Sequence, residues 1–384
     1  MGPYGWVGLG TIAVFLFRRV KRRRPDPGAL RANFGERVTS PDDTGAIVTV
    51  LTNAQGIELY SRCWGAQKLS SPRAIVLLIH GGMWHSRYFE EFGKVLVDNG
   101  FIVYTFDLQS QGLSGSARGL RGDVERFDDI VDDVDAVLDF ARGNHLNAPV
   151  FVYGESMGAL IALLWALKYG SSQKVNGLIL AGSALHISEG ILPPRMLLPL
   201  LGAFVKLFPN VRHRSDEYEG TFDDAFGDPS FPEQARKDPL VVFQTPTLRF
   251  MLQGLGLLQK LSGNLADIEL PFLALHGSED VRCSIEGSRR LYEEASSEDK
   301  TFKTMEGMKH QLLQEPPKNR TIVFDEIVGW LKERTTPPAP AAKKTKKTRS
   351  SVKFDLPDAP YPAGGSKAFV DHGKVMDMLA QNGF

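Results

Sequence analysis

One stretch limits the fold of this chain more than any other: residues 148–161, which read APVFVYGESMGALI. An apolar run typical of a strand leads directly into GESMG at 154–158, and an apolar run typical of a helix follows. A turn this tight leaves almost no room for side chains beside its central residue, so glycines flank the serine and Ser156 is pushed outward. The pattern predicts a strand, a sharp turn and a helix, with Ser156 exposed as a nucleophile.

Composition narrows the class of protein. With 384 residues and 42% hydrophobic content, the chain can bury a large α/β core with additions. Its 45 basic and 45 acidic residues balance, which argues against nucleic acid as a partner. The two cysteines, Cys63 and Cys283, provide no disulfide framework and lack the spacing of a metal site. We therefore expect a reducing compartment and no metal or other cofactor.

Hydrophobic periodicity predicts strands that alternate with helices. Residues 46–52 and 57–63 flank the turn residues NAQG, which predicts an antiparallel hairpin. Continuous apolar runs are typical of strands buried on both faces. Such strands are expected at 74–79, 101–106, 150–153, 177–181 and 271–276, with helices at 87–99, 124–142 and 156–168. The alternation predicts an α/β fold with a mostly parallel sheet flanked by helices.

The alternation stops between Ala181 and Pro271. This connection is far longer than an ordinary link between neighbouring strands, so it predicts an inserted lid or cap. Its residues 191–208 are apolar almost all round, which fits either the core of a cap or a lipid-facing surface. We favour cap core for most of these residues. A run this apolar beside an active site also suggests a channel for an acyl chain.

Both ends of the chain differ in composition from the core. Residues 4–17 carry no charge and are followed at once by RRVKRRR at 18–24, the reverse of the order in a secretory signal peptide. We expect an uncleaved membrane anchor with the catalytic domain facing the cytosol; an organelle-targeting segment is the alternative. Near the other end, Pro and Ala precede a basic run at 343–349. This pattern predicts a disordered tail. We favour a solvated spacer; a contact with anionic lipid and a nuclear address are the alternatives.

These observations divide the chain into six segments. They are an anchor or targeting segment at 1–24, a linker at 25–45, the first part of the core at 46–185, the lid or cap at 186–269, the second part of the core at 270–334 and the basic tail at 335–384.

A serine becomes an effective nucleophile when a histidine takes its proton and a carboxylate orients that histidine. After a strand–GxSxG–helix unit, the acid and then the histidine follow late strands. The strand expected at 271–276 ends in a turn that carries two acids, of which Asp280 suits the turn better and Glu279 is the alternative. Beyond them only His310 and His372 remain. Because His372 lies past the basic linker, His310 is selected.

The reaction places negative charge on an oxygen, and backbone N–H groups can stabilise it. One donor is expected at Met157, the residue after the nucleophile. The other is expected in the loop after 74–79, which reads His80-Gly81-Gly82-Met83. A glycine lets the backbone approach the substrate, so Gly82 is chosen and Met83 is the alternative. His80 is expected to brace this loop.

Four motifs together resemble a known family. HGG at 80–82, GESMG at 154–158, GSED at 277–280 and DKTFKTMEGMKH at 299–310 look like the monoacylglycerol lipase group of serine α/β-hydrolases. The plant and algal branch, which includes esterases of hydroxycinnamoyl esters, looks most similar. The resemblance spans residues 57–331.

The resemblance implies an α/β-hydrolase fold with a mobile apolar lid and hydrolysis of a monoacylglycerol or similar ester without a cofactor. It also places the thiol of Cys283 near the active site, for which a small buried core residue is the alternative interpretation. Ser110 and Gln111 depart from the family, which usually has Gly-His there. Because this position falls on a structural loop, the departure is expected to affect substrate detail and not the chemistry.

The sequence thus predicts a serine hydrolase acting on lipid carboxylic esters, with monoacylglycerol as the favoured substrate. The same residues would serve an esterase or acyltransferase acting on lysophospholipid or hydroxycinnamoyl-type esters. A non-catalytic binding protein with this fold is the alternative of another class. The expected partners are the lipid ester and a membrane surface, contacted through residues 4–24 and also by the lid.

Overall fold

The computed structural model describes residues 37–145, 147–186, 198–212, 222–243 and 246–335. The anchor expected at 4–24 and the tail beyond Thr335 lie outside these residues. No helix among the described residues is both long enough and apolar enough to cross a membrane.

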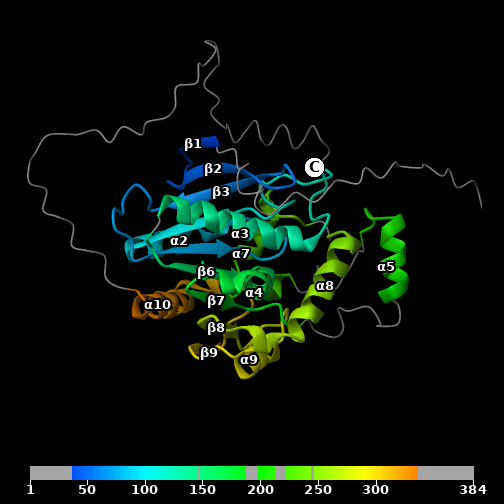
Figure 1. The fold of residues 1–384 in the computed structure, drawn as a ribbon. Helices are drawn as coiled ribbons and strands as arrows, with labels where there is room; N and C mark the ends of the chain where they lie inside the picture. Colours follow the sequence, from blue (N-terminus) through cyan, green and yellow to red (C-terminus); the bar gives the residue numbers. More distant parts are fainter. Residues whose placement is uncertain (1–36, 146, 187–197, 213–221, 244–245, 336–384) are drawn as a thin grey trace, which may run out of the picture.

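A nine-stranded sheet forms the centre of the described chain, in the order β1-β2-β3-β5-β4-β6-β7-β8-β9 (Figure 1). The strands are β1 (Arg37–Pro41), β2 (Ile47–Thr52), β3 (Glu58–Trp64), β4 (Ala74–Ile79), β5 (Phe101–Phe106), β6 (Val150–Glu155), β7 (Gly177–Ala181), β8 (Phe272–Gly277) and β9 (Lys300–Met305). Strands β1, β2, β3 and β5 pair antiparallel, and all pairs from β5 through β9 are parallel. The expected hairpin and the mostly parallel sheet are confirmed.

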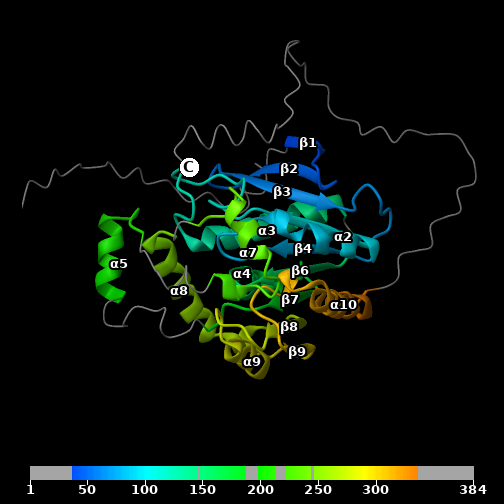
Figure 2. The ribbon, with the colours of Figure 1, turned by 180° about the vertical axis from the view of Figure 1, so that it is seen from behind.

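Helices cover both faces of this sheet (Figures 1 and 2). The helices are α2 (Glu90–Asp98), α3 (Phe127–Asn144), α4 (Met157–Tyr169), α5 (Leu198–Leu207), α7 (Phe231–Lys237), α8 (Leu248–Ser262), α9 (Ile285–Glu294) and α10 (Pro317–Glu333). One apolar cluster joins α3, α4 and α9 to the sheet, and a second joins α2 and α10 to its other face.

Strand β4 shows how the two cores share one sheet. Successive side chains of a strand point to opposite faces. Ile75, Leu77 and Ile79 accordingly belong to the cluster with α3 and α4. Val76 and Leu78 belong to the cluster with α2 and α10. All of these residues are fully buried, which explains why the strand reads as a continuous apolar run.

The structure differs from the sequence analysis at two places. Strand β1 lies within residues 25–45, which were expected to be linker, and it pairs with β2 as an edge strand. Helix α5 lies within residues 186–269, and its apolar residues were expected to be mostly cap core. Instead Leu207 is 76% exposed and Phe208 is 54% exposed, with Leu200 and Phe204 also exposed. The described part of the apolar run is therefore largely a surface.

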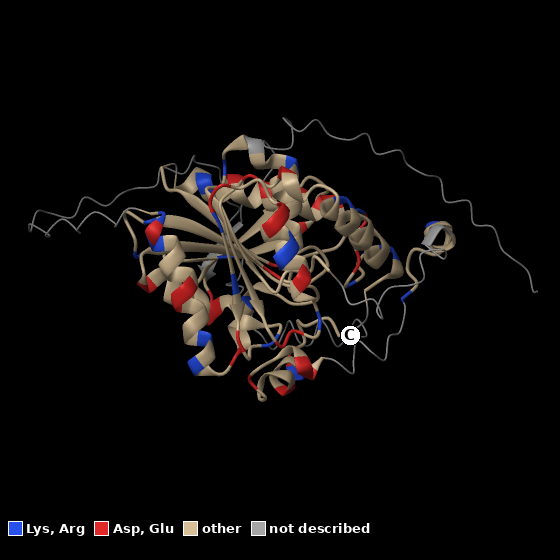
Figure 3. Cartoon of the chain, turned by 90° about the horizontal axis from the view of Figure 1, so that it is seen from below, with Lys and Arg blue, Asp and Glu red and all other residues tan. Residues whose placement is uncertain are grey.

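The position of α5 accounts for this exposure. It packs against α8, outside the layer of helices that contacts the sheet, and both ribbon views show it at the margin of the molecule. Charged residues elsewhere lie mainly on the surrounding helices and loops, while the strands carry few of them (Figure 3). An exposed apolar helix is thus unusual for this surface.

Candidate active site

Ser156 occupies the sharp turn between β6 and α4. Its backbone has φ 53° and ψ −117°, a conformation that costs a residue with a side chain about 1–3 kcal/mol. The turn is held because the Ser156 N–H donates to the carbonyl of Ala181, at 2.9 Å, and because α4 is buried along most of its length. The strained turn presents the serine at the carboxyl edge of the parallel sheet.

The two glycines of the motif, Gly154 and Gly158, are required because backbone atoms of other residues approach them closely. A Cβ atom at Gly154 would lie 2.4 Å from the carbonyl oxygen of Gly158. One at Gly158 would lie 2.2 Å from the carbonyl oxygen of Ile79, on the neighbouring strand. Either distance is a severe clash with backbone, so only glycine fits. The tightness of the turn that the sequence predicts therefore has a direct steric cause.

Asp280 and His310 meet at the same edge of the sheet. Asp280 follows β8, His310 follows β9, and His310 Nδ1 donates to Asp280 Oδ2 at 2.7 Å. Both side chains are buried, at 1% and 5% exposure. The other carboxylate oxygen, Oδ1, accepts the backbone N–H groups of Arg282 and Cys283 at 2.8 and 2.9 Å. The carboxylate is thus fixed in one orientation, with Oδ2 facing the imidazole.

Cys283 lies close to both this pair and Ser156. Its thiol is buried, and its backbone N–H is bound to Asp280 Oδ1. Burial, reinforced by the negative charge of Asp280, raises the pKa of the Cys283 thiol above its ordinary range. The Ser156 side chain interacts with the thiol and slightly offsets the rise in its pKa. The thiol therefore remains protonated and does not compete with the serine as a nucleophile.

His276 is a second histidine bound to Asp280, a contact that no sequence pattern predicts. Its Nε2 lies 3.0 Å from Asp280 Oδ2 and 3.0 Å from the carbonyl oxygen of Cys283, so this nitrogen carries a proton. Its Nδ1 accepts from the Ser288 hydroxyl at 2.8 Å. The His276 side chain is fully buried. A histidine at the end of a buried strand offered no sequence signal for this role.

The environment keeps Asp280 ionised. Burial alone would raise the pKa of its carboxyl, but hydrogen bonds from His276 and His310 outweigh that effect and hold the pKa well below the usual range. An ionised carboxylate is the form that can orient the imidazole and stabilise its protonated state during a reaction.

His80 fixes the loop expected to hold the oxyanion. Burial lowers the pKa of its imidazole to about 4, so the ring is neutral. Its Nε2 accepts the N–H of Leu108 at 3.0 Å, which leaves the proton on Nδ1. Nδ1 then donates to the carbonyl of Gly81 at 2.7 Å. This bond orients the peptide between Gly81 and Gly82, as the sequence analysis expected of a brace.

The two expected oxyanion donors lie next to each other. A Cβ atom at Gly82 would lie 3.4 Å from Met157 Sδ and 3.7 Å from Met157 Cβ. Met157 is the first residue of α4, where a helix N–H has no partner within the helix. The alternative donor, the N–H of Met83, is already bound to Gln111 Oε1 at 2.6 Å. The geometry therefore favours Gly82 over Met83.

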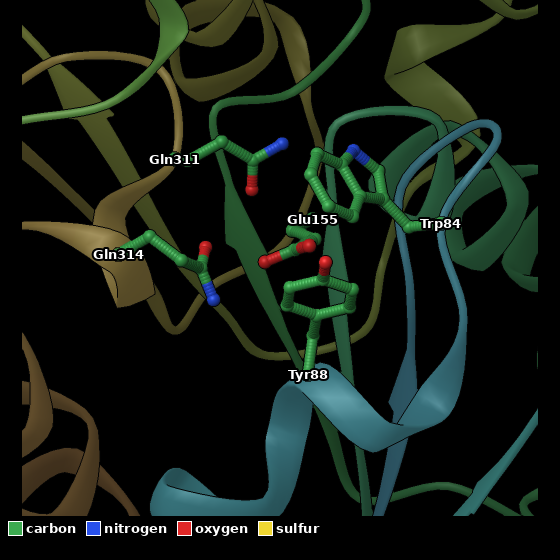
Figure 4. A pocket seen from close by; sticks show the side chains of 5 residues that line it. All are labelled: Trp84, Tyr88, Glu155, Gln311 and Gln314. Atoms are coloured by element: carbon green, nitrogen blue, oxygen red, sulfur yellow. The ribbon is translucent and has the colours of Figure 1, made fainter. Parts of the chain in front are cut away.

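Five side chains converge close to these residues and leave a gap too small to hold a water molecule. Figure 4 shows the side chains that line it, which point toward one another from the end of β6, from the segment after β4 and from the segment after β9. They are Trp84, Tyr88, Glu155, Gln311 and Gln314. Glu155 precedes Ser156 and Gln311 follows His310, so this cluster is joined to both residues through the backbone.

Glu155 is a buried acid with a strongly shifted pKa. Burial raises the pKa of its carboxyl to about 7, an effect partly offset by the N–H of Gly81 and the hydroxyl of Tyr153. An exposed glutamate, as in the unfolded chain, has a pKa near 4.3. At a pH between these two pKa values, Glu155 is protonated in the folded state and ionised in the unfolded state. This difference must reduce stability as the pH rises from about 4.5 to about 7.

We expect Glu155→Gln to remove this contribution. Raising the pH from 5 to 8 lowers the free energy of unfolding of the wild type. In the variant this decrease should be smaller, by on the order of 3 kcal/mol. Urea unfolding at the two pH values measures it. Glu306→Gln, which changes an exposed carboxylate, serves as the control and should leave the pH dependence as it is. Equal pH dependence in wild type and Glu155→Gln would contradict the prediction.

Among the described residues, no group of three or more His, Cys, Asp or Glu side chains could hold a metal ion.

The fold and the site together define the class. A strained serine between a parallel strand and a helix, with an acid and a histidine after later strands, is the arrangement of α/β-hydrolases. Comparison with known proteins agrees: the family described as serine aminopeptidase, S33, matches residues 70–317. Human monoglyceride lipase is 30% identical over 292 residues, covering 74% of this chain and 90% of its own length. The chain belongs to this family of monoglyceride lipase-like α/β-hydrolases and is a serine ester hydrolase.

Other relatives extend the comparison. Caffeoylshikimate esterase of Arabidopsis thaliana is 28% identical, covering 68% of this chain and 78% of its own length. This identity is close to that of the human enzyme, so the comparison does not single out the plant branch. A soluble variant of monoglyceride lipase from Saccharomyces cerevisiae has a similar fold, with a TM-score of 0.65 and 21% identity over 85% of this chain and all of its own.

Proposed function

We propose that this protein hydrolyses carboxylic esters of lipids, with monoacylglycerol as the preferred substrate, through an acyl-enzyme on Ser156. His310 is the general base and acid, Asp280 orients it, and the N–H groups of Gly82 and Met157 stabilise the oxyanion. The observation that carries the proposal is the hydrogen bond of 2.7 Å between His310 and Asp280, beside a serine held in a strained turn.

The proposed reaction has two halves. In the first, Ser156 Oγ attacks the acyl carbonyl while His310 Nε2 takes its proton, and the glycerol oxygen leaves with that proton. In the second, water attacks the acyl-enzyme, His310 accepts a proton from the water, and the fatty acid leaves as the proton returns to Ser156. An alcohol in place of water would transfer the acyl group, which is the acyltransferase alternative.

A lipid substrate is supported by the exposed apolar surface around α5 and by relatives. Leu200, Phe204, Leu207 and Phe208 expose apolar side chains around α5. Contiguous exposed apolar residues on a monomer mark contact with another apolar phase. The human relative is named for monoglyceride, and a Bacillus subtilis relative, 26% identical, is named a phospholipase. A long acyl chain would enter from such a surface.

Membrane attachment forms part of the proposal. Residues 4–24 would anchor the chain with its basic end, and thus the hydrolase, on the cytosolic side. The exposed apolar residues around α5 would contact the lipid surface from which the substrate is taken. This arrangement would bring an insoluble ester to the site without passage through water.

We expect the double variant Leu207→Asp/Phe208→Asp to lose activity selectively. Hydrolysis of a long-chain monoacylglycerol presented in phosphatidylcholine vesicles should fall about tenfold, because two charges oppose contact of the cap with the lipid. Hydrolysis of soluble p-nitrophenyl butyrate should stay within about twofold, because both side chains lie on the surface. Fatty acid and nitrophenol release measure the two rates.

The control variant is Ile322→Asp, an exposed apolar residue on α10, which should affect neither substrate. Equal loss on both substrates would contradict a lipid-contact role for α5. The wild type should also be tested on lysophospholipid and caffeoyl esters. Faster turnover of either one than of monoacylglycerol would replace the proposed substrate with that alternative.

A further inference from the structure

Met83, in the loop after β4, is held by bonds to two distant segments. Its N–H donates to Gln111 Oε1 at 2.6 Å, and its carbonyl accepts the N–H of Val242 at 2.9 Å. Its backbone lies in the left-handed region, with φ 68°, where residues with a side chain rarely rest without support. The two bonds therefore impose a backbone conformation that the residue itself does not favour.

This conformation bears directly on the proposed oxyanion hole. Gly82 lies between two fixed peptide groups, because His80 binds the carbonyl of Gly81 and Gln111 binds the N–H of Met83. The orientation of the Gly82 N–H is thereby set from both sides. Within the described chain this N–H has no acceptor, so it is free to donate to a substrate oxygen.

Gln111 has the features of a residue placed for this contact. It is fully buried, and its Nε2 has no partner among the described atoms, so Oε1 makes the specific bond. The contact of Gln111 with the oxyanion loop is therefore made through its acceptor oxygen. The sequence predicts that the departure at Gln111 affects substrate detail and not the chemistry. In the structure, Gln111 instead contacts the loop expected to hold the oxyanion.

We propose that Gln111 is a positioning residue of the oxyanion hole. It holds the N–H of Met83 away from the substrate and so aims the N–H of Gly82 at the developing oxyanion. The inference rests on the proposed function, because it concerns the donor assigned there. Removing the acceptor should weaken stabilisation of the transition state and leave binding of the ground state almost unchanged.

The test is Gln111→Leu, which keeps the size and removes the acceptor. We expect kcat on p-nitrophenyl butyrate to fall about 10- to 100-fold with KM within about twofold. The inhibition constant of a trifluoromethyl ketone, which forms an oxyanion on Ser156, should rise by the same factor. Gln111→Glu retains an acceptor oxygen and should recover most of the lost kcat.

A matched control separates positioning from stability. Gln109, two residues away, is also buried, and its Nε2 donates to Asp133 Oδ2 at 2.6 Å. Gln109→Leu should lower the melting temperature much as Gln111→Leu does, yet keep kcat and the inhibition constant close to wild type. Unchanged kcat in Gln111→Leu, or an equal fall in both variants, would overturn the proposal.

Labelling by a fluorophosphonate shows which proposal has failed, the serine hydrolase mechanism or the positioning role of Gln111. A wild type that is not labelled would contradict the serine hydrolase mechanism, and the positioning role would fall with it. A labelled wild type whose labelling rate is matched by Gln111→Leu would contradict only the positioning role.

Discussion

Replacing Ser156 by alanine is expected to abolish ester hydrolysis, with a fall in kcat on the order of 10⁵- to 10⁶-fold. Without the hydroxyl no acyl-enzyme can form, and the remaining donors can only assist direct attack by water. The fold should persist, because the turn is held by the backbone bond to Ala181 and by the buried helix α4. Nitrophenol release and fluorophosphonate labelling measure the effect.

The control for this variant is Ser183→Ala, which removes another buried hydroxyl from the same edge of the sheet. The Ser183 hydroxyl has no partner among the described atoms, so activity and labelling should stay within about twofold of wild type. If Ser156→Ala keeps substantial turnover, Ser156 is not the nucleophile. A non-catalytic binding protein would show neither turnover nor labelling in the wild type.

Replacing Asp280 by asparagine is expected to lower kcat about 10⁴-fold. Two backbone N–H groups bind Oδ1, so the asparagine carbonyl will stay there and the NH₂ group will face His310. His310 Nδ1 must then accept a hydrogen bond, which moves the ring proton to Nε2. A protonated Nε2 cannot take the proton of Ser156. Steady-state kinetics of the purified variant measure the loss.

Glu279→Gln is the matched control, because Glu279 is the alternative acid in the same turn. Its side chain is exposed, and its backbone N–H is bound to the carbonyl of Met308. This variant should keep kcat within about twofold of wild type. The reverse result, a large loss in Glu279→Gln and a small one in Asp280→Asn, would transfer the orienting role to Glu279.

The sequence predicts the central fold well because its signals are local. Each buried parallel strand reads as an apolar run, and the glycines around Ser156 report steric contacts within one turn. The order of nucleophile, acid and histidine then limits the candidates to a few residues. Asp280 and His310, selected in this way, lie 2.7 Å apart through Oδ2 and Nδ1, far apart in sequence but after adjacent strands.

Other features depend on contacts that no local pattern records. Strand β1 is an edge strand that pairs only with β2 in the described chain, so its residues need no apolar run. Gln111 and His276 bind partners that only the folded sheet brings near. Helix α5 has the composition of a buried helix, and its exposure follows from its place outside α8. Composition alone could not show whether α5 is part of a buried core or of an exposed apolar surface.

Because α4 is buried, the geometry of the active site depends on the same packing that makes unfolding cooperative. Every residue of 158–166 is buried, so the helix cannot loosen without exposing much of the interior. The strained turn at the start of α4 therefore cannot relax unless a large part of the core is exposed as well. Loss of the active conformation and loss of the native state should occur as one event. Residual turnover during heating would then report the fraction of molecules that remain folded.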